Sequence, residues 1–543
     1  MGILKRFLFA FLLLFIPFVG YATTYTVCNS GCTGTVIQDV IDATDLNSDD
    51  ILEVRADTEG GSKTYTENIT IGSADSGTSG HPVIVRARSG DTITIDGDDV
   101  NTAIFVVSGS YITIDGFLLV NPGSYGFLVG GSSAVAKNSG VTIQNNTITA
   151  TATANTSNSI DGIVVRYADT CTVYNNTYTT TTGTNANQYD GIYIQASTNV
   201  DVNKNTVELK ADNWITEDIE AGHNDCIQVA GGNGSIAYGS TGNITVRNNT
   251  CYQNNAITKN RQFMYFEYEI TGYLYVYNNV MWKPSSNGSY GLYRLTNGAD
   301  ETDNGTTYFY NNSMYIGGAS AGCYATNVAD SYIKGNICHI NAGGSAAIIT
   351  LRAVVADANV NNNIGYKTAT ASSFRLWNSE ANAFYTFTQW QALGYDTNGT
   401  FTDPLFTDVD DPPNLALTSG SPAREIGVDL SGTFTTDILG NTRPNVDGAW
   451  DAGAYEYGAD EETPTYYTVT ISKTGDGCSI NNGAFEVVAT ESIDAVPVVN
   501  NGWKGTWAGT CGATGVVSDG VKYTKTPTED CTVSIACEEI LIW

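Results

Sequence analysis

A short strand that ends in asparagine recurs along the middle of this chain and constrains its fold more than any other feature. Two clear copies are Val-Thr-Ile-Gln-Asn-Asn-Thr at 141–147 and Ile-Thr-Val-Arg-Asn-Asn-Thr at 244–250. Successive copies are mostly 24 to 33 residues apart, with one longer step of 44. A period of this length is typical of one solenoid coil built from several short strands. The final asparagines of the copies are Asn146, Asn176, Asn205, Asn249, Asn279, Asn312, Asn336 and Asn363.

The asparagine has a physical role in such a coil. The chain must turn sharply between strands, and asparagine tolerates a left-handed backbone conformation while its amide can bond to the backbone. Stacked coils would bring these amides about 4.8 Å apart, where each can bond to the next. We therefore expect a ladder of asparagines with a structural function.

A second family of strands precedes the first in each coil, as in Asp-Gly-Ile-Val-Val-Arg at 161–166 and Asp-Gly-Ile-Tyr-Ile-Gln at 190–195. Alternation of side chains along a strand sends every second residue into the core. The predicted inward pairs are Ile163/Val165, Ile192/Ile194, Ile227/Val229 and Met264/Phe266. At the start of the solenoid, residues 35–43 show helical spacing of apolar residues and predict a capping helix, followed by a strand at 51–54.

These features resemble the pectate-lyase-like right-handed parallel β-helix proteins of secreted bacterial enzymes. The resemblance rests on the asparagine-ended coils, on the opening segment 27–41, and on closing motifs such as Gly-Asn-Thr-Arg-Pro at 440–444 and Asp-Ala-Gly-Ala-Tyr-Glu at 451–456. It covers about residues 25–457 and implies an all-β solenoid. This superfamily holds lyases, hydrolases, epimerases and adhesins, so the resemblance implies a fold and leaves the activity open.

The ends of the chain predict further segments. A basic start, an apolar run from Phe7 to Val19 and a small residue at Ala22 indicate a secretory signal peptide over 1–22, and no later run is long enough to span a membrane. The mature β-helix is expected over 23–457, with 403–457 as its closing segment. An acidic linker at 458–464 leads to a small β-repeat module at 465–543, which resembles modules at the ends of bacterial surface proteins.

Charge and cysteine content narrow the partners and the compartment. The formal net charge of −31 argues against nucleic acid as a partner, because phosphate binding needs a basic surface. The same acidity would attract Ca²⁺. In an exported protein the 11 cysteines are expected to form disulfides. Cys28 and Cys32 could close a small loop, Cys226 and Cys251 fall within one repeat, and the remaining pairing is not deducible from sequence.

The outward positions of the second strand family predict a binding surface for a sugar chain. One outward row carries Tyr193, Gln228, Tyr265 and Tyr293, and the neighbouring row begins with Arg166. Aromatic rings stack on the C–H surfaces of sugars, and amides bond to hydroxyls. The alternative is an ordinary exposed sheet, in which tyrosine is common. The expected partner is a polysaccharide or a cell-surface glycan.

Acidic residues stand at the start of the same strands. Asp161, Asp190 and Asp225 lie one per coil, and stacked carboxylates repel unless a cation or hydrogen bonds intervene. They are candidate Ca²⁺ ligands, or an acid/base pair of the glycosidase kind. The structural alternative is a ladder of Asp-Gly turns.

Ionisable residues cluster around the long 44-residue step and predict a catalytic site. The candidates are His223, Asp225, Lys259, Arg261 and Glu267. A lyase needs a cation to neutralise a uronate carboxylate and a base to remove the adjacent proton. For the basic residues Lys259, Arg261, Arg166 and Arg294, the structural alternative is a solvated surface charge.

The leading hypothesis is a secreted protein that binds and cleaves a polysaccharide by β-elimination with Ca²⁺. The alternatives are a non-catalytic surface or adhesion protein with the β-helix as a rigid stalk, and a hydrolase that uses paired aspartates. Clustered ionisable groups at the 44-residue step favour catalysis, because a stalk does not need them.

Overall fold

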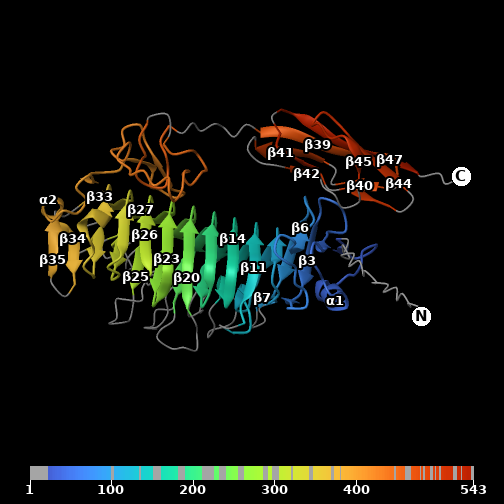
Figure 1. Ribbon diagram of the computed structural model, residues 1–543, viewed down its shortest axis with the longest axis horizontal. Helices are drawn as coiled ribbons and strands as arrows, with labels where there is room; N and C mark the ends of the chain where they lie inside the picture. Colours follow the sequence, from blue (N-terminus) through green and yellow to red (C-terminus); the bar gives the residue numbers. More distant parts are fainter. Residues whose placement is uncertain are drawn as a thin grey trace, which may run out of the picture.

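The computed structural model shows a chain wound into a long coil of short strands (Figure 1). In the part of the chain that the structure describes, three parallel sheets of 12 strands each make up the solenoid. From β2 (Ile51–Val54) to β34 (Ser372–Trp377) the strands join sheets A, B and C in turn. The fold is a right-handed parallel β-helix, as the sequence predicted. The one antiparallel addition among these strands is β35 (Asn382–Thr386), which pairs with β34 (Ser372–Trp377) at the end of sheet C.

The strands of each sheet follow in spatial order. Sheet A contains β1 (Thr24–Val27), β2, β5 (Val83–Ala87), β8 (Ile112–Asp115), β11 (Asn138–Gln144), β14 (Ala168–Tyr174), β17 (Thr198–Asn203), β20 (Thr241–Arg247), β23 (Ile270–Tyr277), β26 (Thr306–Tyr310), β29 (Ser331–Lys334) and β32 (Val360–Asn361). Sheet B contains β3 (Ser62–Thr66), β6 (Thr92–Asp96), β9 (Leu118–Val120), β12 (Thr147–Ala150), β15 (Thr177–Thr180), β18 (Thr206–Lys210), β21 (Thr250–Asn254), β24 (Val280–Lys283), β27 (Ser313–Ile316), β30 (Ile337–Ile340), β33 (Ile364–Lys367) and β36 (Thr400–Phe401). Sheet C contains β4 (Ile69–Ile71), β7 (Ala103–Val107), β10 (Tyr125–Val129), β13 (Asp161–Arg166), β16 (Ile192–Gln195), β19 (Ile227–Ala230), β22 (Met264–Glu267), β25 (Leu292–Leu295), β28 (Tyr324–Thr326), β31 (Ile349–Leu351), β34 and β35.

The structure describes residues 22–98, 103–133, 136–150, 160–180, 190–210, 225–231, 240–254, 262–284, 291–295, 305–318, 322–341, 346–368, 372–378, 381–444, 448–458, 466–476, 478–480, 483–488, 493–495, 497–500, 503–517, 523–527 and 529–539. Almost all of the predicted signal peptide therefore lies outside the described residues. In the described part, no helix is long and apolar enough to cross a membrane.

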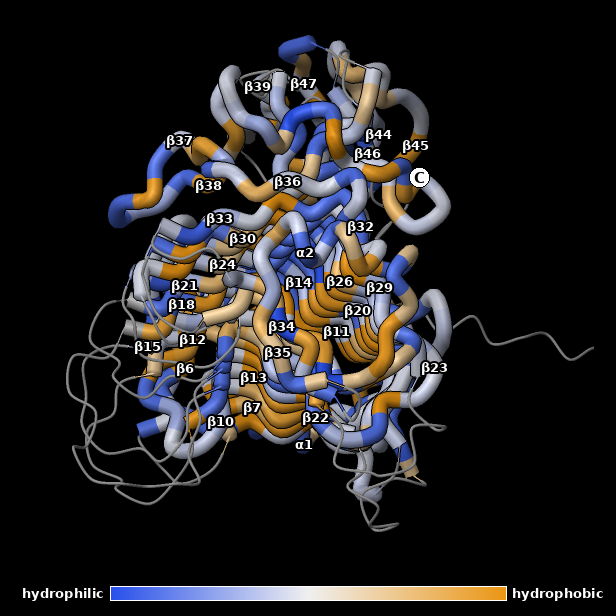
Figure 2. Tube along the Cα trace, turned by 90° about the vertical axis from the view of Figure 1, so that its left-hand side faces the viewer, coloured by the Kyte–Doolittle hydropathy of each residue, from blue (hydrophilic) through white to orange (hydrophobic). Residues whose placement is uncertain are grey.

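Buried apolar residues of the three sheets form one core inside the coil. Figure 2 shows hydrophobic positions, in orange, recurring along the stacked strands. The inward pairs predicted from strand alternation are confirmed, since each of those side chains is at most 1% exposed. Stacking one coil on the next therefore buries a continuous core, and burial of this kind is worth about 25 cal/mol for each Å² of apolar surface.

The asparagine pairs divide two tasks at the corner between sheets A and B. The first residue of the pair takes the left-handed backbone conformation, with φ of 55° at Asn145 and 54° at Asn248. Lys204 and Gly335 take the same conformation at equivalent positions. The second residue makes the ladder. The sequence predicted both tasks for one asparagine, and the structure separates them.

The ladder is continuous across the 44-residue step. The side-chain oxygen of Asn249 accepts hydrogen bonds from the backbone N–H of Asn205 at 2.9 Å and from its side-chain amide at 3.0 Å. The amide of Asn249 in turn donates to Val202 O and to Asn279 Oδ1. The same pattern links every neighbouring pair from Asn146 to Asn363. The insertion at the long step therefore leaves this corner unchanged.

An aspartate ends the ladder. Asp396 Oδ1 accepts from the backbone N–H of Asn363 at 3.1 Å and from its side-chain amide at 2.8 Å. Burial raises the pKa of Asp396 to about 6, although the hydrogen bonds from Asn363 and Trp390 act in the opposite direction. The last rung is therefore a buried carboxyl group in the place of an amide.

Helices cover both ends of the solenoid. At the start, α1 (Ile37–Ala43) buries Ile37, Val40 and Ile41, and begins two residues later than predicted. The Glu67 carboxylate accepts the N–H groups of Ile37 and Gln38 at 3.0 Å each, where the helix has unpaired donors. At the other end, a 3₁₀ turn at Asp357–Asn359 precedes α2 (Phe387–Ala392), which places Trp390 in the core.

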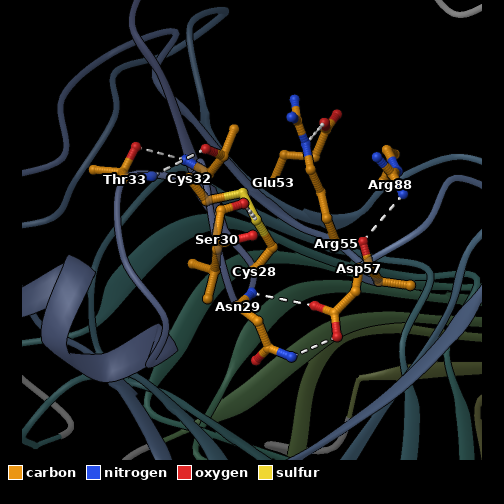
Figure 3. The surroundings of a disulfide bond; sticks show 12 residues. Cys28, Asn29, Ser30, Cys32, Thr33, Glu53, Arg55, Asp57 and Arg88 are labelled. Atoms are coloured by element: carbon orange, nitrogen blue, oxygen red, sulfur yellow. Dashed lines mark hydrogen bonds and ion pairs between the residues drawn. A yellow bond between two sulfur atoms is a disulfide. The ribbon is translucent and has the colours of Figure 1, made fainter.

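A disulfide fastens the N-terminal loop beside the first coil. Cys28 and Cys32 are bonded, as the sequence suggested (Figure 3). Within the loop, the backbone N–H and the side-chain amide of Asn29 both donate to the carboxylate of Asp57. The loop is thereby tied to the chain that leaves β2.

The closing segment, residues 403–457, packs along the outside of the corner between sheets A and B (Figure 1). Its hairpin of β37 (Phe406–Asp408) and β38 (Asn414–Leu417) belongs to this packing. Trp282 Nε1 donates to Val409 O at 2.8 Å, and Phe434 stacks on Tyr277 with 4.5 Å between ring centroids. Asn311, the first residue of an asparagine pair and left-handed in its backbone conformation, donates a hydrogen bond to Asp451 O at 2.9 Å.

A buried ion pair joins the two closing motifs. The Arg443 guanidinium binds Glu456 Oε2 at 2.8 Å and the carbonyl of Gly453 at 2.8 Å. Both charged side chains are at most 1% exposed. These two motifs carried part of the family resemblance. Their ion pair stabilises the packing of the closing segment on the asparagine corner.

Five disulfides are present in the described residues, and all stay within one coil, one loop or the C-terminal strands. The pairs are Cys28–Cys32, Cys226–Cys251, Cys323–Cys338, Cys478–Cys537 and Cys511–Cys531. Cys171 is the remaining cysteine, and burial raises the pKa of its thiol to about 12. The odd cysteine is therefore an apolar core residue.

The C-terminal strands form a sheet of their own. Its order is β41 (Gly483–Val488), β39 (Tyr466–Thr474), β47 (Cys531–Glu539), β44 (Trp503–Ala508) and β45 (Gly515–Val517). Two two-stranded sheets accompany it, β40 (Cys478–Ile480) with β43 (Pro497–Val499) and β42 (Ile493–Ala495) with β46 (Tyr523–Lys525). Trp507 is buried in this core and Trp503 packs against it. The predicted boundaries near 458 and 465 stay predictions, because residues 459–465 lie outside the described part.

Replacement of Asn249 by alanine is expected to lower the free energy of unfolding by about 3 kcal/mol or more, because it leaves two buried donors of Asn205 without their acceptor. Urea unfolding measures the change. Gln144→Ala, on the outward side of the same corner, serves as a control with a much smaller expected effect. Equal losses in the two variants would contradict the structural role of the ladder.

Replacement of Asp396 by asparagine is expected to stabilise the protein at neutral pH. The folded-state pKa of about 6 lies above the ordinary value of 3.8, so the folded state binds more protons between these values and stability falls as pH rises through them. Removing the buried ionisation should gain roughly 3 kcal/mol at about pH 7.5 and almost nothing at about pH 3.5. Unfolding of both proteins at the two pH values measures this, and the same difference at both would refute the assignment.

Candidate functional site

The outward face of sheet C holds the predicted binding row. The register of β16, β19, β22 and β25 places Tyr193 beside Gln228, Gln228 beside Tyr265, and Tyr265 beside Tyr293. The rings of Tyr265 and Tyr293 stack with 5.6 Å between centroids and 18° between planes. The four side chains therefore form one continuous row across four coils.

Glu267 belongs to this face. It lies in the neighbouring outward row, and its carboxylate accepts a hydrogen bond of 2.7 Å from the side-chain amide of Gln228. Burial, followed by the charge of Glu267, raises the pKa of the Tyr265 hydroxyl. Gln228 and Tyr293 are only 2% and 9% exposed, so this face is more enclosed than the sequence analysis expected.

Arg166 lies at the N-terminal end of the face. It is paired in register with Gln195, and its charge counteracts the rise that burial causes in the pKa of Tyr193. Its Nε is buried with no hydrogen-bond partner among the described residues. The arginine therefore places a positive charge beside the tyrosine row.

The three aspartates stack at the corner that precedes sheet C. Asp161 Oδ1 accepts the backbone N–H of Asp190 at 3.0 Å, and Asp190 Oδ1 accepts that of Asp225 at 2.9 Å. Asp225 Oδ1 accepts the N–H of Gln262 at 3.2 Å. This is a second ladder, built from carboxylates, and it supports the turn-forming interpretation that the sequence left open.

The carboxylates of this ladder are buried and hydrogen-bonded, unlike those of an open cation site. Its members are at most 5% exposed, and one oxygen of each braces the next coil. In the described residues, no group of three or more His, Cys, Asp or Glu side chains has an arrangement that could hold a metal ion. A role for Ca²⁺ therefore stays a prediction.

A buried lysine lies next to this ladder and was missed in the sequence analysis. Lys283 ends β24, is 5% exposed, and has a pKa lowered to about 8 by burial, while the charge of Asp225 acts in the opposite direction. A lysine with a pKa near neutrality is suited to proton transfer. Strand alternation could have found it, because Lys283 lies two residues after the inward Met281.

The structure contradicts the alternative of a solvated surface charge for Arg294. It occupies an inward position of β25 with 0% exposure, and burial lowers its pKa to about 9. Its Nη1 donates to the carbonyls of Phe266 and Tyr268, at 3.3 and 2.7 Å. The guanidinium therefore binds the backbone on both sides of Glu267.

Three of the predicted catalytic residues cannot be placed. His223, Lys259 and Arg261 lie outside the described residues. Of the other two predicted catalytic residues, Glu267 lies beside the tyrosine row, where it is hydrogen-bonded to Gln228. Asp225 belongs to the carboxylate ladder.

A cluster at the C-terminal end of the same face was also missed. We name Arg352, Arg375, Trp377 and Phe384 the guanidinium–aromatic cluster. Arg352 lies 5.4 Å from the ring centroid of Tyr293 and 4.1 Å from that of Trp377. The cluster therefore continues the tyrosine row. Little in the sequence indicated this cluster, because the asparagine and Asp-Gly patterns fade after Asn363.

Comparisons with known proteins add little beyond the fold. Neither a protein-family model nor a curated protein matches the chain. Among solved structures, a pectate lyase is similar at 16% identity, with 80% of this chain and 97% of that chain covered and a TM-score of 0.43. An alginate lyase from Paenibacillus sp. covers 60% of this chain and 96% of its own at 14% identity, with a TM-score of 0.34.

A rhamnogalacturonan lyase is similar at 11% identity, with 68% of this chain and 90% of that chain covered and a TM-score of 0.31. These values are too low to transfer an activity or a residue role. The three sheets themselves establish the architecture. The chain is a right-handed parallel β-helix.

Proposed function

We propose that this protein is a secreted carbohydrate-active β-helix that binds a polysaccharide along the outward face of sheet C and cleaves it by β-elimination. The observation that carries the proposal is the continuous row from Tyr193 to Tyr293, with the Glu267 carboxylate hydrogen-bonded to Gln228 beside it. Aromatic rings, amides and a carboxylate on one face suit a chain of pyranose rings.

Within this proposal the described residues have distinct tasks. Tyr265 and Tyr293 support the sugar rings, and Arg166 and Gln228 orient polar groups. Glu267 exchanges protons with the substrate, and Arg294 is a positioning residue that holds its backbone. His223, Asp225, Lys259 and Arg261 complete the proposed site.

Secretion is part of the proposal. Five disulfides in the described residues fit an oxidising compartment, where such bonds form and persist. The apolar N-terminal segment over 1–22 would direct export and be removed.

A non-catalytic surface protein is the second candidate. The burial of Gln228 and Tyr293, and the bracing role of the carboxylate ladder, favour it. A hydrolase using paired aspartates receives less support, because Asp161 and Asp190 each accept a backbone N–H from the next coil.

Incubation of residues 23–543 with a panel of uronate-containing and neutral polysaccharides tests the proposal. We expect an ultraviolet-absorbing unsaturated product, reduced about a hundredfold or more in Glu267→Gln and in Lys259→Ala, because proton transfer by one side chain contributes about 10² to 10⁴ in rate. Lys334→Ala, on the outward face of sheet A, is the matched control and should keep full activity. The same incubation in the presence of a chelator measures whether product formation requires Ca²⁺.

The other outcomes separate the alternatives. New reducing ends without unsaturated product would refute β-elimination in favour of hydrolysis. Retained binding without any product across the panel would refute cleavage in favour of the surface protein.

A further inference from the structure

The guanidinium–aromatic cluster is held by the hairpin that ends sheet C. Pairing of β34 with β35 places Arg375 opposite Phe384 and Trp377 opposite Asn382. Arg375 lies 4.0 Å from the ring centroid of Trp377 and 4.9 Å from that of Phe384, and its Nη2 donates to Asn382 Oδ1 at 3.2 Å. The cluster is therefore a defined arrangement on paired strands.

Two guanidinium groups share one indole ring. Arg352 and Arg375 lie 4.1 and 4.0 Å from the centroid of Trp377, so the two positive charges are no farther apart than about twice that distance. Like charges at such separations repel, and a negatively charged group between or beside them relieves the repulsion.

The protein supplies no such negative group in the described residues. Other arginines of the chain are paired with carboxylates, as Arg86 is with Glu53 and Arg247 is with Asp201, both at 2.8 Å. Neither Arg352 nor Arg375 has a carboxylate partner in the described part of the chain, and the Nε of each is buried without a hydrogen-bond partner there. In a protein of net charge −31, two adjacent unneutralised cations are a local exception.

Exposed aromatic rings accompany these charges. Trp377 and Phe384 are 38% and 39% exposed, among the most exposed large apolar side chains of the described residues. An exposed indole next to guanidinium groups offers an apolar surface for a sugar ring and hydrogen-bond donors for an anion. The same face continues through Tyr293, which Arg352 also contacts.

We propose that the guanidinium–aromatic cluster is a binding subsite for an acidic sugar residue, in which Arg352 and Arg375 bind its carboxylate or sulfate group and Trp377 and Phe384 contact its ring. The subsite rests on the proposed function and deepens it, because it names the residues that would bind the acidic group of the polysaccharide on sheet C. It requires binding on that face and does not require cleavage.

Binding of short oligosaccharides to residues 23–543 tests the subsite by titration calorimetry. The probes are an oligogalacturonate, its methyl ester and a sulfated galactan oligosaccharide. We expect the free acid, the sulfate or both to bind, and the methyl ester to bind at least tenfold more weakly, since bonds between charged partners are roughly twice as strong as neutral ones. Binding should weaken between about 50 and 500 mM NaCl.

The double variant Arg352→Gln/Arg375→Gln should lose at least tenfold in affinity for the acidic probe, and Trp377→Ala should lose affinity for all probes. The matched control is Lys204→Gln/Lys334→Gln, which removes the same charge from two lysines that lie over tyrosine rings on sheet A. This control should bind as the parent protein does. Circular dichroism establishes that each variant is folded.

The outcomes separate the subsite from the proposed cleavage. If the arginine double variant loses affinity for the carboxylate probe alone, the subsite binds a uronate. If it loses affinity for the sulfated probe alone, the subsite binds a sulfated sugar. Unchanged affinity in the arginine double variant, measurable binding of the acid and the ester with equal affinity, or no binding of either acidic probe would each overturn the subsite. Acidic-probe binding that depends on the arginines, without product from any polysaccharide, would refute cleavage and leave the subsite standing.

Discussion

Hydrogen bonds between stacked asparagines at the corner of sheets A and B hold the coils of this protein in register. Each second asparagine of a pair accepts from both the backbone and the side chain of its neighbour, so every coil is bound to the next at the same point. The first residue of the pair supplies the left-handed turn that makes this possible. With this corner fixed, the inward rows of the three sheets stack into one core.

The same constraint positions the outward face of sheet C. A coil that cannot slip in register places Tyr193, Gln228, Tyr265 and Tyr293 in one row, and brings Glu267 within hydrogen-bond distance of Gln228. The closing segment packs on the asparagine corner through Arg443 and Glu456, away from this row. The interactions that stabilise the solenoid and the residues proposed to bind sugar therefore lie on different faces.

The sequence predicted the solenoid, the ladder, the inward pairs and the outward row, because each follows from a local period of residue types. Alternation from the outward Tyr293 places Arg294 inward, but the sequence could not predict its partners, which are carbonyls of the neighbouring coil. It also missed Lys283, whose low pKa arises from burial. The guanidinium–aromatic cluster escaped prediction because it depends on an antiparallel hairpin beyond the last regular repeat.

Hydrogen exchange of residues 23–543, with and without an acidic oligosaccharide, tests most directly whether sheet C carries the binding site. The account predicts slower exchange in β22, β25, β31 and β34, and no change in β23 and β26, whose tyrosines lie on sheet A. Protection confined to sheet A or to the C-terminal strands would contradict it.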